Sequence, residues 1–406
     1  MKTVYLHIGM PKTGTTALQM FLPLNEEALS QNGFSYPLMP FEFENIGKRR
    51  NAHFLTLWEN KEDMPEWTEG FKIVEKAFLQ HDNLILSDEN IWSKQRLDNF
   101  WEDVCEGFSN IGATLKVVAY LRSQDEQVES NWNQKVKDKK TRMQITFEQF
   151  MEEERYYYIP FDYGQVLDRI SSYVGRENVI VRVYEKQQFS GGSIFADFLE
   201  AIGLELSDEY ELPEFTPNVR LSNTAVEIKR LINSAYEGEE VPDIYREIIS
   251  RAFDMKHRME IPERNSSMFS PALREKFMSK YADSNKYVAR EYLHRADGVL
   301  FRDNLAATPQ WKMDDHEILL DMIRIFAAEG VYLFNRETRI KEMEQELDRK
   351  LREFKKLSNK QYLETTGRLN KLDSLVGELY NSLPFRIYRK LRDKKQNSDS
   401  SQQGAE

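Results

Sequence analysis

Cysteine is nearly absent from this chain: among its 406 residues, Cys105 is the single thiol. One cysteine excludes an intrachain disulfide and a cysteine-rich zinc site. Long hydrophobic runs are missing as well, because the longest apolar stretches have the length of a strand, so we expect no membrane-spanning helix. The N-terminus leads straight into an apolar strand and leaves no room for a signal peptide, which predicts a cytoplasmic location.

Positive charge is also in deficit, with 56 Lys and Arg against 67 Asp and Glu and a net charge of −11. This balance argues against a general nucleic-acid binder. If the protein binds an anionic cofactor, it must concentrate its positive charge locally. The chain is 40% hydrophobic and 30% charged, which predicts a soluble protein with a large core. Its length predicts about two to three domains.

A phosphate-binding loop is predicted at residues 7–17, His-Ile-Gly-Met-Pro-Lys-Thr-Gly-Thr-Thr-Ala. The loop follows a short apolar strand and opens a helical stretch that begins at Ala17. Gly9, Pro11 and Gly14 allow the backbone to turn tightly. The sequence therefore predicts a strand, a tight turn and a helix N-terminus in immediate succession.

The donors of this loop are its backbone NH groups and the side chains around them. The NH groups of residues 13–16 are predicted to converge at the helix N-terminus, where the dipole favours an anion. Lys12 adds a point charge, and the threonine hydroxyls add donors. The loop is not a Walker A motif, because Gly-Lys-Ser/Thr is missing and the lysine precedes the second glycine. The anion-binding residues predicted here are Lys12, Thr13, Gly14, Thr15 and Thr16.

A second phosphate site is predicted roughly 110 residues further on. Residues 115–121 form a near-continuous apolar run, as expected of a buried parallel strand. Arg122 follows directly, and Ser130 comes eight residues later, a little over two helical turns. Taken singly, Arg122 suits a surface ion pair and Ser130 a helix-surface hydroxyl. Two such motifs in this order, each after a strand, favour a phosphate site.

The segment Pro-Lys-Thr-Gly-Thr-Thr at residues 11–16 resembles the 5′-phosphosulfate loop of sulfotransferases that use PAPS, 3′-phosphoadenosine 5′-phosphosulfate. Arg122 and Ser130 resemble the pair that holds the 3′-phosphate in that family. The resemblance covers roughly residues 1–305. It implies transfer of a sulfuryl group from PAPS to a hydroxyl or amine, with Lys12 neutralising the leaving phosphate oxygen. No metal is required by this chemistry.

Two further segments extend the resemblance. Many family members have a late Gly-rich loop with a lysine, which this chain lacks, and residues 216–224 look like its bacterial substitute. Arg220 and Ser222 are then expected to make the last phosphate contacts, although an ordinary helix N-cap region is the alternative. Residues 281–294 resemble an element that bacterial members carry near the end of the domain.

The acceptor must lose a proton, so a general base is expected near Lys12. His53 lies between the cofactor motifs, where several sulfotransferases place a catalytic histidine. Glu89 lies just past a strand end, beside Asp88. The alternatives are a satisfied half-buried histidine and a carboxylate in a first helical turn. We favour His53 over Glu89, and we interpret His7, which precedes the loop, as structural.

Alternating strands and helices predict an α/β fold, a three-layer αβα arrangement with a central parallel sheet and right-handed βαβ units. Ligands of such sheets bind at the carboxyl ends of the strands. Both phosphate motifs fall there, which supports the site independently. The predicted strands are residues 3–8, 83–87, 114–121 and 178–184, and the predicted helices are residues 15–30, 64–80, 97–107, 123–136 and 163–174.

The composition changes after Asn335. Residues 1–305 are predicted to form the catalytic domain, and residues 306–335 a connecting helical segment. Residues 336–383 carry leucines and other apolar residues at three- and four-residue steps, which predicts a long helix or coiled coil that drives self-association; a helix packed on the domain is the alternative. Residues 384–406 begin with six basic residues against one acid within 384–395, which suits an anionic membrane surface or a solvated basic tail, and end in a disordered stretch.

The acceptor itself is the least determined part of the prediction. Aromatic rings that follow the second motif would stack well on a sugar, which favours a carbohydrate or glycolipid, although for any one of them an ordinary core position is the favoured interpretation. A P-loop kinase or NTPase is an alternative, as is a non-catalytic coiled-coil assembly protein with a vestigial nucleotide site. The intact Lys12, Arg122 and Ser130 argue against such decay. The aromatic residues are Tyr156, Tyr157, Tyr158, Phe161 and Tyr163.

Overall fold

The three-dimensional structure is a computed structural model of the whole chain. It describes residues 2–43, 47, 49–94, 97–138, 140–213, 222–235, 266–303 and 308–361, with short helical pieces at 377–378, 386–387, 389–390 and 392. The chain divides into two compact units, Met1–Ala328 and Glu329–Glu406. The sheet and both phosphate motifs belong to the first unit.

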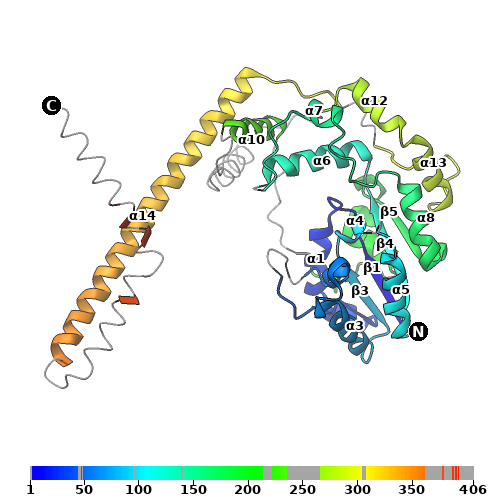
Figure 1. Cartoon of the computed structure of the whole chain (residues 1–406), viewed down its shortest axis with the longest axis horizontal. Coiled ribbons are helices and arrows are strands. Elements are labelled where there is room, and N and C mark those ends of the chain that lie inside the picture. The colour runs from blue at the N-terminus through cyan, green and yellow to red at the C-terminus, as the bar shows by residue number, and fades with distance from the viewer. Residues whose placement is uncertain are drawn as a thin grey trace. The chain divides into compact units, whose positions relative to one another are not determined.

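The first unit is built on a five-stranded parallel sheet (Figure 1) in the order β2-β3-β1-β4-β5. This confirms the predicted α/β class and the central parallel sheet. Four strands were predicted from their apolar runs, and their bounds agree to within one residue. The strands are β1 Thr3–His7, β2 Phe34–Ser35, β3 Asn83–Ser87, β4 Thr114–Leu121 and β5 Val179–Val183.

Helices cover both faces of the sheet, as the alternation predicted. Leu6 of β1 belongs to a core with apolar residues of α3, α5 and α8, whereas its neighbour Tyr5 belongs to a second core with residues of α1, α2 and α9. Successive side chains of a strand point to opposite faces, so one strand feeds both cores. These helices are α1 Thr15–Leu24, α2 Glu26–Gln31, α3 Pro65–Ala77, α5 Phe100–Asn110, α8 Tyr163–Val174 and α9 Ile194–Ala201.

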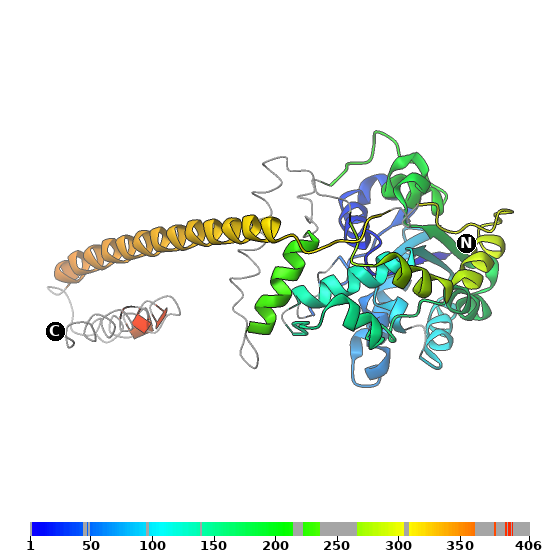
Figure 2. The same cartoon turned by 90° about the horizontal axis from the view of Figure 1, so that it is seen from above.

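Further helices belong to the same unit as the sheet. Helices α6 and α10 are far apart in the sequence but lie side by side in both views (Figures 1 and 2). Their bounds, with those of the others, are η1 His53–Asn60, α4 Ile91–Lys94, α6 Gln124–Lys137, α7 Phe147–Glu152, α10 Asn223–Ala235, α12 Pro271–Ser279 and α13 Ala282–Glu291.

The helix predicted at residues 15–30 is two helices. The break falls at Asn25, whose side-chain NH₂ donates to the Phe21 carbonyl at 2.8 Å and to the Glu211 carbonyl at 2.8 Å. Its amide oxygen accepts from the Glu211 backbone at 2.6 Å. A side chain that takes over backbone partners in this way ends a helix, and its partner lies too far along the chain to be found by periodicity.

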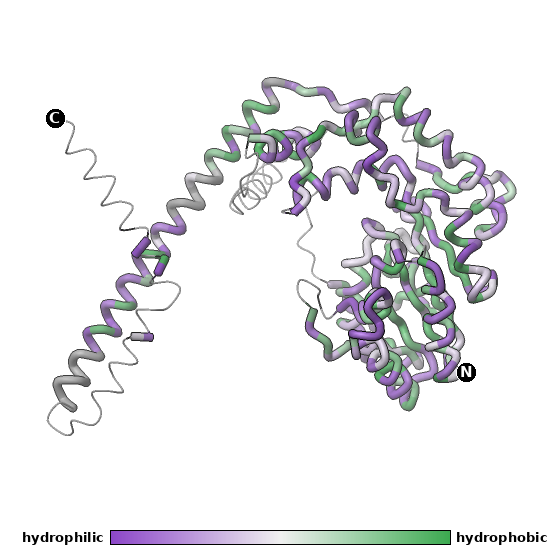
Figure 3. The backbone as a smooth tube through the Cα atoms, viewed as in Figure 1, coloured by the Kyte–Doolittle hydropathy of each residue, from purple (hydrophilic) through white to green (hydrophobic). Residues whose placement is uncertain are grey.

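The last long helix, α14, runs from Asp315 to Gln361. The change of composition at Asn335 therefore does not mark its beginning, as the predicted boundary at residue 336 implied. Beyond residue 335 the described part of α14 is mainly hydrophilic with recurring hydrophobic residues (Figure 3). Within the described ranges, no helix is both long and apolar enough to cross a membrane.

Candidate anion site at the carboxyl edge of the sheet

The predicted phosphate loop lies where the strand order reverses. Strand β1 is flanked by β3 on one side and β4 on the other, and a crevice at such a reversal is the usual ligand position. Beyond its end, the chain stays beside β4: the Met10 NH donates to the Tyr120 carbonyl at 3.0 Å, and the Tyr120 NH donates to the Gly9 carbonyl at 2.7 Å. These bonds hold the loop against the last residues of β4.

The loop delivers uncapped NH groups to the start of α1. Gly14 is the N-cap residue, with a left-handed φ of 74° and no side-chain cap hydrogen bond. Its carbonyl accepts from the NH groups of Ala17 and Leu18. The NH groups that precede them have no carbonyl within the helix to bind. The strand, tight turn and helix N-terminus therefore follow one another as predicted, while the binding of an anion there stays a prediction.

The three threonines of the loop differ in their surroundings. Thr13 is buried, and its hydroxyl donates to the Met10 carbonyl at 2.5 Å, so this side chain braces the turn and only its backbone remains for a ligand. Thr15 is buried at the helix start, and Thr16 is exposed. The hydroxyl role predicted for these residues therefore falls to Thr15 and Thr16.

Lys12 has an unusual backbone conformation for a residue with a side chain, with φ of 69°. Its ammonium donates to Oε1 of Gln134 on α6 at 2.9 Å. The residue reaches solvent, yet the protein around its ammonium lowers its pKa by desolvation, and the nearby Arg122 lowers it further. Glu89 acts in the opposite direction. A bound anion would favour the charged form in the same way as Glu89.

The structure brings the two phosphate motifs together. Arg122 follows β4, and its Nη1 donates to the Lys12 carbonyl at 3.2 Å. Its Nε donates to Oε2 of Glu126 at 3.0 Å, in a pair whose side chains are 15% and 31% exposed. The ion pair considered for Arg122 therefore exists. It does not exclude a ligand, because a partly exposed pair contributes little and a phosphate can replace the carboxylate.

Ser130 lies between these contacts on one face of α6. Glu126, Ser130 and Gln134 are four residues apart, so they form a stripe along the helix. The first member binds Arg122, and the last binds Lys12. Ser130 is half-buried and lies on the same face of α6 as Glu126 and Gln134. The stripe could be anticipated from the eight-residue spacing, but the roles of Glu126 and Gln134 could not.

The third predicted segment is described only in part. Arg220 lies outside the described residues, and its phosphate contact stays a prediction. Ser222 is buried, and its Oγ accepts from the NH of Ala225 at 3.3 Å at the start of α10. This is the N-cap arrangement named as the alternative for Ser222, and a contact with a ligand stays untested.

A buried carboxylate organises the neighbouring strand end. Asp88 follows β3 and has no exposed side-chain surface. Arg50 donates to both of its oxygens, at 2.5 Å and 3.0 Å. His53 places Nδ1 3.0 Å from Oδ2. Neither Asp88 nor Arg50 was predicted as a site residue. In the sequence, Asp88 is marked only by its position next to Glu89, and Arg50 only by its position three residues before His53.

Glu89 lies closer to the loop than the sequence suggested. A Cβ on Gly9 would stand 2.9 Å from the Glu89 Cβ, so the glycine is required for this close approach. Oε2 of Glu89 accepts from Nε2 of Gln19 on α1 at 3.0 Å, and Oε1 of Glu89 lies 3.7 Å from Nη1 of Arg50. Glu89 thus connects α1 with the Asp88 cluster, to which His53 also belongs.

His7, interpreted as structural, is fully buried. Its Nδ1 lies 2.9 Å from Oγ of Ser87, and its ring packs edge-on against Tyr120 and Phe198. Burial lowers the pKa of His7 to about 4. It is a neutral core residue, as expected.

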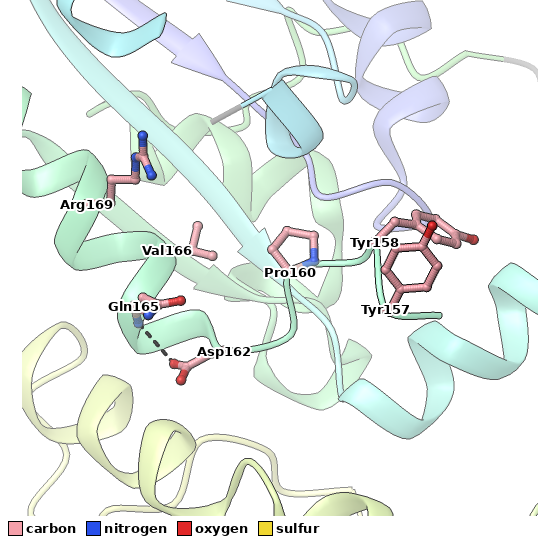
Figure 4. Close-up of a pocket in the computed structure, with 7 residues that line it drawn as sticks. All are labelled: Tyr157, Tyr158, Pro160, Asp162, Gln165, Val166 and Arg169. Carbon is pink, nitrogen blue, oxygen red and sulfur yellow. Dashed lines mark hydrogen bonds between the residues drawn. The ribbon is translucent and has the colours of Figure 1, made fainter. Parts of the chain in front are cut away.

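A cavity of about 230 Å³ lies between α8 and the segment that precedes it (Figure 4). Tyr158 at its rim donates to Oδ1 of Asn131 at 2.5 Å, and the ammonium of Lys135 is 4.8 Å from its ring centroid. Both partners belong to α6, next to Ser130 and Gln134. The aromatic cluster is therefore divided: three members, Tyr156, Phe161 and Tyr163, are buried in the core. The lining residues are Tyr157, Tyr158, Pro160, Asp162, Gln165, Val166 and Arg169.

The comparisons with known proteins leave the family open. No family model matches the chain. An uncharacterised protein of Archaeoglobus fulgidus is 29% identical over 189 residues, which are 46% of this chain and 47% of that protein. The chain thus spans about half the length of the relative it matches. The fold is that of an α/β protein with a central parallel sheet, and the predicted anion-binding residues of the loop follow the carboxyl end of β1.

Proposed function

We propose that the protein is a sulfotransferase that moves a sulfuryl group from PAPS to a hydroxyl or amine of an acceptor. The proposal rests on the arrangement of Lys12, Arg122 and Ser130. The first two are in contact beside the uncapped start of α1, and Ser130 lies on the face of α6 that binds both of them. Two cations and a hydroxyl, supplied by segments roughly 110 residues apart, suit a ligand with two separate anionic groups. A single phosphate would not need both ends of this arrangement.

The residues present fit such a donor. PAPS, when bound, supplies the sulfuryl group and leaves as 3′-phosphoadenosine 5′-phosphate, PAP. The NH groups of Thr15 and Thr16 would hold the 5′-phosphosulfate at the helix start. Lys12 would neutralise the bridging oxygen, which becomes negative as its bond to sulfur breaks. The new bond forms from the acceptor oxygen or nitrogen to sulfur, and the acceptor's proton goes to a base, for which His53 and Glu89 remain the candidates.

Recognition of the 3′-phosphate is assigned to Arg122 and Ser130. Arg122 can offer its guanidinium to the phosphate once Glu126 gives way, while its other NH group stays on the Lys12 carbonyl. Ser130 adds a hydroxyl donor from the same face of α6. A cofactor without this phosphate loses a charge-assisted contact, which gives the site its selectivity.

For the acceptor, the proposal uses the cavity beside α8. Its tyrosines offer apolar faces, and Asp162, Gln165 and Arg169 offer polar groups, a combination that suits a sugar ring. A carbohydrate or glycolipid is therefore the acceptor class that we favour. The tyrosine end of the cavity is joined to the Lys12 side of the crevice through α6.

Titration calorimetry of the full-length protein tests the proposal. We expect PAP to bind without Mg²⁺ and at least about 30-fold more tightly than ADP, because the 3′-phosphate contacts contribute roughly 2 kcal/mol or more. ATP and GTP serve as the comparison ligands. Equal binding of PAP and ADP would reject the assignment. Tight, Mg²⁺-dependent binding of ATP would favour the kinase or NTPase alternative, and the absence of any nucleotide binding would favour an assembly protein.

Truncation after Asn335 is expected to leave PAP affinity unchanged and to remove self-association or attachment to vesicles. The truncation keeps Asp321 and Ile325 of α14, which are buried in the first unit. Calorimetry measures the first effect, and analytical ultracentrifugation and vesicle sedimentation measure the second. A truncated protein that fails to fold would show that the removed helix belongs to the core. The basic segment 384–395 lies mostly outside the described residues, so its membrane contact stays a prediction.

A further inference from the structure

The hydrogen bonds of Asp88 are distributed unequally over its two oxygens. Oδ1 accepts from Nη2 of Arg50 at 2.5 Å and from the backbone NH of Asn90 at 2.8 Å. Oδ2 accepts from Nε of Arg50 at 3.0 Å and lies 3.0 Å from Nδ1 of His53. Guanidinium and backbone NH groups can only donate. Three of these four contacts therefore have a determined direction, with the Asp88 carboxylate as the acceptor.

The atoms around His53 decide which ring nitrogen carries the proton. Nδ1 faces the Asp88 carboxylate and also lies 3.0 Å from Oγ1 of Thr56. The Thr56 hydroxyl donates to the carbonyl of His53 at 2.7 Å, so it turns a lone pair toward the ring. Nδ1 thus has two acceptors before it and must be the protonated nitrogen. In the neutral ring, Nε2 then holds the lone pair.

The contact with Asp88 links His53 to two further charged residues, Arg50 and Glu89. Arg50 carries one positive charge. Its guanidinium lies 2.5 Å from the carboxylate of Asp88 and 3.7 Å from the carboxylate of Glu89. The uncharged ring of Phe43 also packs edge-on against the imidazole of His53, with their ring centroids 4.8 Å apart.

We propose that Asp88, clamped by Arg50, is a positioning residue that holds His53 in the tautomer protonated on Nδ1 and so keeps Nε2 as the proton acceptor of the reaction. The tautomer follows from the contacts alone. The use of Nε2 rests on the proposed function: as the acceptor oxygen bonds to sulfur, its O–H bond breaks and the proton passes to Nε2, while Nδ1–H stays hydrogen-bonded to Asp88.

The test is a ¹⁵N NMR spectrum of the full-length protein labelled at its six histidines. His53→Gln identifies the His53 signals by their loss. In the wild type we expect a neutral imidazole whose Nδ1 carries the hydrogen, seen in the one-bond ¹⁵N–¹H couplings and in the ¹⁵N shifts. A wild-type ring protonated on Nε2 would overturn the proposal.

Asp88→Asn is expected to reverse the tautomer. Two obligatory donors face the Oδ1 position and one, Nε of Arg50, faces Oδ2, so the amide oxygen is favoured at Oδ1 and the NH₂ group then faces His53. Nδ1 would then have to accept, and the hydrogen would move to Nε2. Turnover should fall by about 10²- to 10⁴-fold, as expected when a base is held in the wrong tautomer. An unchanged tautomer in a folded variant would remove the positioning role.

Asp103→Asn is the matched control, because Asp103 likewise pairs with a cation, Lys61, and accepts from Trp58, but away from the crevice. It should leave the His53 signals and turnover unchanged. The two proposals fail separately. Without PAP binding, the sulfotransferase assignment fails while the tautomer result stands; with PAP binding and normal turnover in Asp88→Asn, the role of His53 as base fails, and Glu89→Gln becomes the decisive variant.

Discussion

Replacing Lys12 by Ala should lower the turnover of sulfuryl transfer by about 100-fold or more, while the affinity for PAPS falls far less. The reason is that the bridging oxygen gains its negative charge in the transition state and not in the bound ground state. In the proposed complex the ground-state anion would already be held by the NH groups at the start of α1 and by Arg122, whereas the bridging oxygen becomes negative only as the S–O bond breaks. The ammonium reaches as far as Gln134, so it can follow the leaving oxygen.

Single-turnover and steady-state rates, together with calorimetry, separate the two effects in Lys12→Ala. Lys72→Ala is the control, because Lys72 forms only an exposed ion pair with Glu69 and should change neither quantity. Near-normal turnover in Lys12→Ala would reject the sulfuryl-transfer interpretation of the loop. An equal loss of affinity and rate would instead make Lys12 a binding residue.

Replacing Arg122 by Ala should erase most of the preference for PAP over ADP. The guanidinium is the charged partner proposed for the 3′-phosphate, and such a contact contributes about 2–3 kcal/mol, or roughly 30- to 150-fold in affinity. ADP should be affected much less, since it lacks that phosphate. Calorimetry with both nucleotides measures the ratio directly.

Two companion variants sharpen the Arg122 result. Glu126→Gln should raise PAP affinity, because it removes the carboxylate that now occupies Nε of Arg122. Arg155→Ala removes an arginine whose side chain is 58% exposed in an ion pair with Glu153, and it should have no effect. If Arg122→Ala weakens PAP and ADP equally, the arginine supports the loop through the Lys12 carbonyl and does not read the 3′-phosphate.

The strands and the loop could be predicted because their signals are local. The apolar run at residues 115–121 can be buried on both faces only in a parallel sheet, and Gly14 directly precedes a helix whose first NH groups need an anion or water. Strand β2 was missed because two residues, Phe34 and Ser35, show no periodicity. The start of α14 was misplaced because charge content changes at residue 336 while helical propensity does not.

The Asp88 cluster could not be predicted because its geometry depends on tertiary packing. Arg50 and Asp88 are separated by η1, α3 and β3, and nothing in the sequence pairs them. The same holds for the contact of Lys12 with Gln134. The sequence supplied the candidates His53 and Glu89, but their partners Asp88, Arg50 and Gln19 appear only when the ends of β1 and β3 are brought to one edge.

At position 12, the left-handed backbone favours one kind of residue and the proposed chemistry favours another. A residue other than glycine held at φ of 69° costs about 1–3 kcal/mol. In a library of variants sorted only for resistance to heat or protease, glycine or asparagine should therefore be enriched at position 12. In a library sorted for product formation, lysine should persist despite its cost. The difference between the two outcomes would measure how much conformational stability the chain gives up to keep an ammonium group in the crevice.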